Sequence, residues 1–204
     1  MRILNLLSII LVLLSLTTGC ATFREDGRAT LSKWPPDAPV NKNTIALQVS
    51  GKAIANDEQM DVNEGILEQW RKEVIRAYET SGLFSAVKSG REKSDIYADV
   101  KISDKGEPNM FMAFLTGFTM FLIPSKVHEC LIINTTYKDQ NGKALNSVSK
   151  TECVNSWIGL FVFPAMFSNS PGTVPKDVLF DLNRSSILEA NSKATFNTVS
   201  RGEP

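Results

Sequence analysis

Few side chains of this chain have the type and spacing that catalysis or metal binding requires. His128 is the only histidine in 204 residues, and no neighbouring residues suggest the Ser-His-Asp arrangement of a hydrolase. Cys130 and Cys153 accompany it without the Cys or His spacing of a zinc site. The Gly-Lys pairs at 51–52 and 142–143 lack the upstream glycines of a phosphate-binding loop. We therefore expect no catalytic residue, no metal, no cofactor and no enzymatic activity, and we expect His128 at a strand edge.

Cys20 is the residue whose surroundings predict a definite chemical modification. Arg2 and an apolar run over 3–16 precede Thr18-Gly19-Cys20, and a charged start, an apolar stretch and small residues in this order are typical of a secretory signal. A cysteine directly after the small residues resembles the signal of bacterial lipoproteins, although Thr17 stands where that signal usually has Leu. The resemblance implies that residues 1–19 are a signal peptide and that Cys20 becomes the lipidated, palmitate-bearing first residue.

Three other interpretations of this segment stay open. It can be a plain secretory signal cut near the same position, an uncleaved anchor helix, or an apolar start whose cysteine has no significance. The run is about 14 residues long, shorter than the roughly 20 residues that span a bilayer. Ala21 rather than Asp follows the cysteine, which resembles lipoproteins that enteric bacteria send to the outer membrane. The resemblance implies a lipid anchor in the outer membrane and a domain that faces the periplasm.

Composition limits the partners and the domain organisation. The 22 basic and 22 acidic residues cancel, so charge gives no reason to expect nucleic acid as a partner. Residues 20–42 are polar and contain Trp34-Pro35-Pro36, so we expect an extended, lipid-anchored tether there. Residues 43–204 are enough for one domain with its own core. Export to an oxidising compartment predicts that Cys130 and Cys153 form a disulfide, with two free buried thiols as the alternative.

Hydrophobic patterning predicts the elements of this domain. Alternation predicts strands over 44–50 and 95–103, and a shorter strand is expected over 83–88. Residues 61–81 have the spacing of an amphipathic helix, with Asp61 and Glu64 as a capping box and Gly82 as its end. A final helix is expected over 176–193. The order of the elements predicts an α+β fold, with a mainly antiparallel sheet, two packed helices and two apolar segments.

A hairpin is expected where Asn141-Gly142 separates strand-like runs over 127–138 and 143–154. A two-residue loop pairs Cys130 directly with Cys153, at a hydrogen-bonded site with Cα atoms about 5.5 Å apart. A three-residue loop with Gly142 in the left-handed region places them one residue out of register, and a bulge can shift either pairing. In each case the two sulfur atoms lie close together.

Two charge-free apolar runs, at 110–123 and 157–167, contain seven of the eleven Phe residues. They can pack against each other and the sheet as core, or form a surface that contacts the membrane or a partner. Neither is long enough to span a bilayer as a helix. The aromatic residues of the two runs are the candidate contact residues: Phe111, Phe114, Phe118, Phe121, Trp157, Phe161, Phe163 and Phe167.

The stretch Gly82-Leu83-Phe84-Ser85-Ala86-Val87 and the alternating residues 94–100 resemble a group of small, uncharacterised Gram-negative envelope lipoproteins. Leu115–Pro124 and Trp157–Phe161 resemble the same group. Similar domains occur in the curli-secretion lipoprotein and in the amino-terminal domains of Tol-type proteins. The resemblance implies a fold and no catalytic residues.

These observations predict a lipid-anchored, non-enzymatic cell-envelope protein that acts as a binding or assembly module at the membrane. The alternative is an auxiliary subunit of an envelope transport or secretion complex. In both cases the expected partners are the membrane, through the lipid anchor, and another envelope protein. The sequence predicts no oligomeric state.

Overall fold

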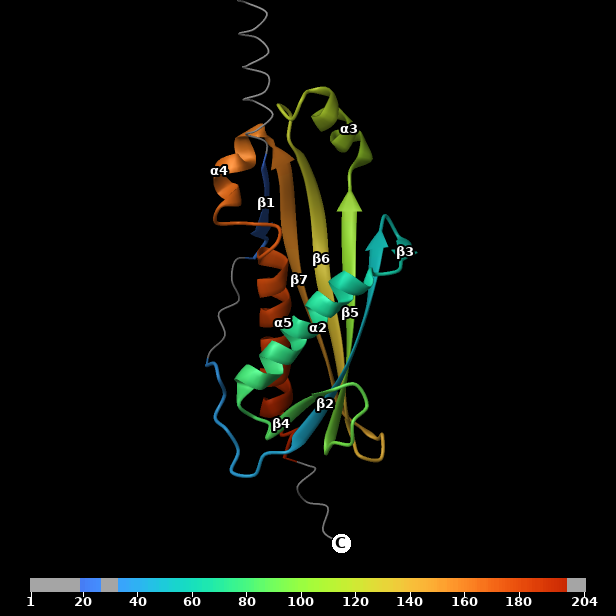
Figure 1. Cartoon of the computed structure of the whole chain (residues 1–204), viewed down its shortest axis with the longest axis vertical. Coiled ribbons are helices and arrows are strands. Elements are labelled where there is room, and N and C mark those ends of the chain that lie inside the picture. The colour runs from blue at the N-terminus through green and yellow to red at the C-terminus, as the bar shows by residue number, and fades with distance from the viewer. Residues whose placement is uncertain (1–18, 27–32, 198–204) are drawn as a thin grey trace, which may run out of the picture.

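The computed structural model describes residues 19–26 and 33–197. The predicted signal peptide lies outside these ranges, except for Gly19. The α+β fold class is confirmed: the described residues form a mainly antiparallel seven-stranded sheet with helices against one face (Figure 1). The strands follow the spatial order β1-β7-β6-β5-β2-β3, and β4 pairs with β2.

The strands are β1 (Gly19–Arg24), β2 (Thr44–Ala55), β3 (Glu58–Met60), β4 (Ala86–Ser89), β5 (Ile96–Pro108), β6 (Ser125–Asp139) and β7 (Ala144–Gly159). The helices are α2 (Glu64–Ser81), α3 (Met110–Phe118), α4 (Phe163–Met166), α5 (Val174–Ser192) and the 3-10 turn η1 (Leu160–Val162).

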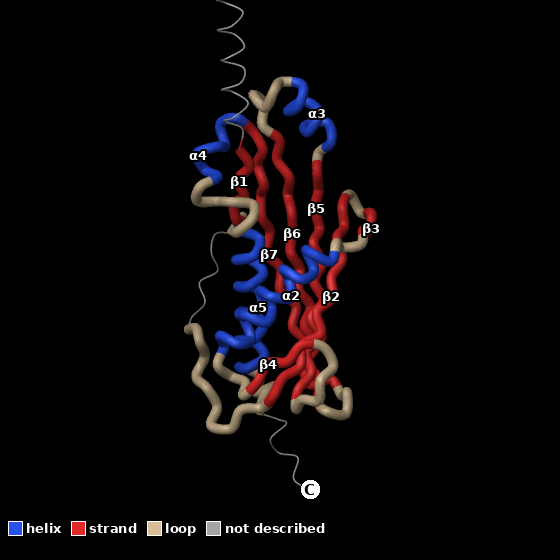
Figure 2. The backbone as a smooth tube through the Cα atoms, in the orientation of Figure 1, coloured by secondary structure: helices blue, strands red, loops and turns tan. Residues whose placement is uncertain are grey.

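The core lies between the sheet and two helices that pack against each other, α2 and α5 (Figure 2). Alternate residues of β5, including Val100 and Ile102, are fully buried on the face that these helices cover. A hydrogen bond of 3.0 Å joins the hydroxyls of Tyr78 on α2 and Tyr137 on β6 inside this core. Because the pair is buried, each hydroxyl needs such a partner, and the bond fixes α2 over the central strands.

The start of α2 differs from the predicted capping box. Asn63, rather than Asp61, is the N-cap, and its side-chain oxygen accepts a hydrogen bond of 2.8 Å from the backbone N–H of Gly65. Asn and Asp are equally good caps, so the local pattern did not distinguish two starts two residues apart. Gly82 ends the helix as predicted, with a φ of 68°.

The β6–β7 hairpin combines the two predicted registers. The backbone N–H of Asp139 bonds to the carbonyl of Lys143, and Gly142 has a φ of 79°, as in a three-residue loop. A bulge between Tyr137 and Lys138 then shifts the pairing, so that Cys130 lies directly opposite Cys153. Their Cα atoms are 4.0 Å apart, so the predicted spacing of about 5.5 Å, typical of a hydrogen-bonded pair, is wrong.

The first part of the expected tether is a strand of the sheet. Residues 19–24 form β1, which pairs antiparallel with the end of β7 from Gly19 opposite Gly159 to Arg24 opposite Val154. Ala21 and Thr22 are fully buried. The prediction of an extended tether from residue 20 is therefore wrong over β1, because pairing with β7 was not visible in so short a run.

Arg24 fixes the end of β1 to helix α5. Its Nη1 atom lies 2.8 Å from Oδ2 of Asp181 and 3.4 Å from Oε1 of Glu152, and the three side chains are at most 10 % exposed. Asp181 also pairs with Arg184 at 2.9 Å. This buried cluster joins β1, β7 and α5, and removal of Arg24 leaves its two acidic partners without the cation they share.

We predict that Arg24→Ala lowers the free energy of unfolding by about 3 kcal/mol, because Asp181 and Glu152 then lose a buried counter-charge. Urea unfolding followed by circular dichroism measures this change. The matched control is Lys33→Ala, which breaks the exposed Lys33–Asp37 pair and is expected to cost less than about 0.5 kcal/mol. Equal effects of both substitutions would contradict a structural role for the cluster.

Candidate functional site

The two apolar runs meet at one end of the molecule. Figure 1 shows α3 at the end of β5 and α4 at the end of β7, at the same end of the sheet's long axis. The backbone N–H of Leu160 donates a hydrogen bond of 2.9 Å to the carbonyl of Phe121. A Cβ on Gly159 would lie 2.9 Å from Cβ of Pro124, so only glycine allows this approach. We call residues 110–123 and 158–167 the apolar tip.

Most of the predicted contact residues are on the surface of the apolar tip. Six of the eight have exposed fractions between 37 % and 76 %: Phe111, Phe114, Phe118, Phe121, Phe161 and Phe167. Phe163 is half-buried and packs edge-to-face on Phe167, with ring centroids 5.3 Å apart. Trp157 is half-buried and belongs to β7 rather than to a separate apolar segment. Core packing, one of the two interpretations of the runs, is therefore wrong for most of these rings.

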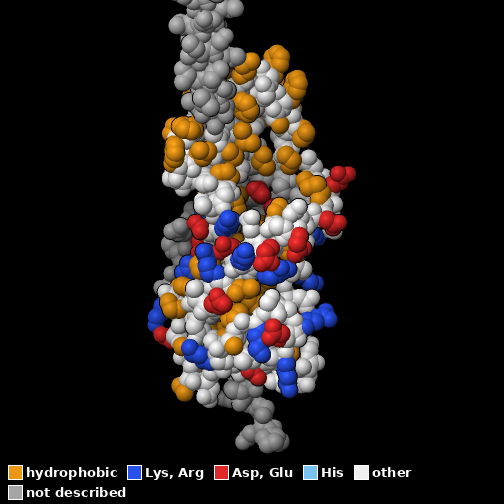
Figure 3. All heavy atoms as spheres, in the orientation of Figure 1, with side chains coloured by type: hydrophobic (Ala, Val, Ile, Leu, Met, Phe, Trp, Pro, Cys, Tyr) orange, Lys and Arg blue, Asp and Glu red, His pale blue; other side chains and the backbone are white. Residues whose placement is uncertain are grey.

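The exposed surface extends beyond the aromatic residues that the sequence indicated. It also contains the following side chains: Met110, Met120, Leu122, Ile123 and Ile158. Aromatic residues alone do not mark these aliphatic side chains. The absence of charge over the whole run is the sequence feature that covers them. In Figure 3 hydrophobic side chains cover this end, and the charged side chains lie over the rest of the molecule.

The exposure of so much apolar surface has an energetic cost. Burial of one Phe side chain contributes about 1.5–3 kcal/mol, and contiguous exposed patches of this kind are rare on monomeric soluble proteins. The composition of the apolar tip is therefore that of a surface covered by a protein partner or by lipid.

Cys20 lies in β1 at the apolar tip. It is opposite Ile158 of β7, and a Cβ on the preceding Gly19 would lie only 2.6 Å from Cα of Phe163. Cys20 is the only cysteine of the described residues outside a disulfide, and burial raises the pKa of its thiol. Any group attached at Cys20 thus starts next to α4. Within residues 19–26 and 33–197, no helix is long and apolar enough to cross a membrane.

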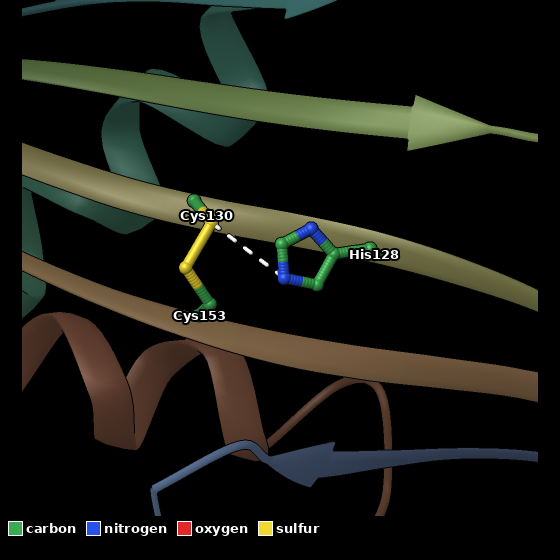
Figure 4. A group of neighbouring side chains, drawn as sticks. All are labelled: His128, Cys130 and Cys153. Atoms are coloured by element: carbon green, nitrogen blue, oxygen red, sulfur yellow. Dashed lines mark hydrogen bonds between the residues drawn. A yellow bond between two sulfur atoms is a disulfide. The ribbon is translucent and has the colours of Figure 1, made fainter.

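His128 lies beside the disulfide on the face of the sheet away from α2 and α5 (Figure 4). Its Nε2 atom is 3.9 Å from Sγ of Cys130 and 3.1 Å from Oε2 of Glu25. The hydrogen bond from His128 is the main cause that lowers the pKa of Glu25. Cys130 and Cys153 are joined in a disulfide, so neither sulfur is a thiolate able to bind a metal.

Asp104 and Glu129 form an acidic pair on the opposite face, beyond the end of the helix layer. Asp104 is opposite Leu131, two residues along β6 from Glu129, so the two carboxyl groups lie on the same face of the sheet. Burial, followed by the charge of Glu129, raises the pKa of Asp104 to about 7. No sequence pattern indicated this pair, because the residues are 25 positions apart in the chain.

The comparisons with known proteins do not assign a family. No family model and no curated protein matches this chain. A minor lipoprotein from Acinetobacter baumannii has a similar structure, with a TM-score of 0.44 and 8 % identity over 76 % of this chain and 96 % of that one. A PelC dodecamer from Paraburkholderia phytofirmans has a TM-score of 0.37 and 7 % identity over 83 % of this chain and 94 % of that one. At these values, the resemblance to envelope lipoproteins stays a prediction from the sequence.

The raised pKa of Asp104 predicts a pH-dependent stability. The unfolded carboxyl ionises near 3.8, whereas the folded one keeps its proton up to about 7. The folded state therefore binds the extra proton between these values, and stability falls as the pH rises through this window. Above pH 7 Asp104 is ionised in both the folded and the unfolded state, and the folded state carries the full cost of the buried charge.

We expect Asp104→Asn to raise the melting temperature at pH 8 and to have little effect near pH 4, because the amide carries no charge at either pH. Thermal unfolding at both pH values measures the difference. Asp57→Asn, with a side chain 90 % exposed, is the control and should change neither value. An Asp104→Asn variant that is less stable at pH 8 would show that the carboxylate stabilises the fold.

Proposed function

We propose that this protein is a lipid-anchored, non-enzymatic component of the bacterial outer membrane, with its domain in the periplasm, that acts as a binding or assembly module. The observation that carries the proposal is the position of Cys20 in β1 at the apolar tip. A lipid at this residue places the exposed Phe side chains next to the membrane. The charged part of the domain then extends away from it.

Buried contacts hold the strand that contains Cys20 firmly in the domain. β1 pairs with β7 from Gly19 to Arg24, and Arg24 is paired with Asp181 on α5. The backbone N–H of Thr22 also donates a hydrogen bond of 2.8 Å to the carbonyl of Asn169. The anchor residue is therefore attached to a rigid sheet, so the orientation of the domain at the membrane is restricted.

The surroundings of His128 support a non-enzymatic role. This imidazole is on an open sheet face, paired with Glu25 and next to a disulfide. Nε2 contacts a carboxylate oxygen and an oxidised sulfur, and neither is a nucleophile that a general base activates. The pair fits a structural contact between β6 and the residue after β1.

The second candidate is an auxiliary subunit of an envelope transport or secretion complex, in which other subunits cover the apolar tip. The same exposed side chains favour it, because an obligate interface resembles a hydrophobic core. The mass of the detergent-extracted protein by light scattering separates the two: a single chain favours the binding module, and a closed oligomer favours the subunit.

We predict that Cys20→Ser abolishes incorporation of an alkyne-labelled palmitate in cells, because thioether and amide acylation both need a cysteine first residue. In-gel fluorescence measures this loss. The matched control is the double variant Cys130→Ser/Cys153→Ser, which should keep full labelling. Labelling that persists in Cys20→Ser would contradict Cys20 as the lipid site.

A further inference from the structure

We propose that the apolar tip itself inserts into the membrane leaflet to which Cys20 is anchored, so that the domain has two lipid contacts instead of one. This inference rests on the proposed function and names lipid acyl chains as the partner of the exposed tip. Three observations on the chain carry it.

The first observation is that the proposed site of lipid attachment lies directly beside the apolar tip. Gly19 and Cys20 lie against Phe163 and Ile158, and residues 3–16 are apolar and precede them. With the lipid that the proposed function attaches to Cys20, the membrane lies within one residue of the tip. A protein that covers the tip would then compete with lipid already there.

The second observation is the order of side-chain types along the sheet. The tip at 110–123 and 158–167 contains no Asp, Glu, Lys or Arg. The next residues toward the body are Trp157 and Lys126, which face each other across β7 and β6, with Nζ 5.8 Å from the ring centroid. An apolar layer, then Trp with Lys, then mixed charges is the order of a bilayer interface, where Trp lies at the headgroups and Lys extends its amine to water.

The third observation is the internal pairing of polar groups in the tip. The hydroxyls of Thr116 and Thr119 each donate a hydrogen bond of 2.8 Å to a backbone carbonyl one turn earlier. Asn109 accepts a hydrogen bond of 3.0 Å from the backbone N–H of Met112. Leu160 bonds to Phe121 across the two segments. Entry into hydrocarbon requires such internal pairing, because lipid tails offer no hydrogen bonds.

A protein partner fits these features less well. The centre of a protein interface is enriched in Tyr and Arg as well as Trp, Phe and Met, and a polar rim surrounds it. The apolar tip contains neither Tyr nor Arg. With the tip in the leaflet, the long axis of the sheet lies along the membrane normal, and the β6–β7 turn lies at the end of the sheet opposite the lipid (Figure 1).

The test uses the lipidated, mature protein with one introduced thiol. Cys130 and Cys153 are in a disulfide and Cys20 carries the lipid, so a new cysteine is the only reactive thiol. Phe114→Cys and Phe161→Cys place a fluorophore in the tip, at residues 68 % and 76 % exposed, and Asn141→Cys places it in the distal turn. Each protein is reconstituted into phosphatidylethanolamine–phosphatidylglycerol vesicles that contain a quencher at mid-chain or at the headgroup.

The proposal expects loss of most of the fluorescence at positions 114 and 161 with the mid-chain quencher, less loss with the headgroup quencher, and no change at 141. Adding Phe111→Ser and Phe118→Ser to the Phe161→Cys protein should restore most of its emission, while the melting temperature stays that of the parent. Full exposure of positions 114 and 161 in protein that still floats with the vesicles would overturn the inference and leave the lipid anchor intact. Protein that fails to float at all would instead overturn the anchoring on which the inference rests.

Discussion

The length of the central strands relative to the helices is the constraint on which this structure depends. β6 and β7 have 15 and 16 residues, or about 50 Å at roughly 3.3 Å per residue. α5, with 19 residues, spans about 28 Å at roughly 1.5 Å per residue. One helix layer therefore covers only about half of the sheet, and the far ends of β5, β6 and β7 extend beyond it (Figure 2).

The difference in length between strands and helices determines which residues lie on the part of the sheet that the helices do not cover. The uncovered part of the helix-facing side holds the Asp104–Glu129 pair, where carboxyl groups stand in positions that are apolar lower down the same strands. Beyond the pair, the strand ends connect through α3 and through η1 and α4, which present apolar side chains outward. The polar pair and the apolar tip are thus successive layers along the same strands.

The buried charges around Arg24 explain how a short N-terminal strand stays in a sheet at its edge. β1 has only six residues and pairs with a single strand, β7. The Arg24–Asp181 ion pair adds a specific contact to α5, and removal of one member leaves the other charge buried with less compensation. The proposed lipid-bearing end and the helical layer are therefore linked through an arginine that the sequence pattern assigned to a tether.

The sequence by itself determined the α+β class, the hairpin around Asn141-Gly142, the Gly82 end of α2 and the absence of charge in the two apolar runs. These are local properties: side-chain periodicity, turn chemistry and composition over neighbouring residues. It did not determine the Asn63 cap, since Asp61 and Asn63 are equivalent in local chemistry, nor the strand β1, whose partner strand is more than a hundred residues away. The tertiary structure alone decided that the apolar runs lie outside the core and meet Cys20 at one end, because that depends on how far the strands extend beyond the helices that cover them.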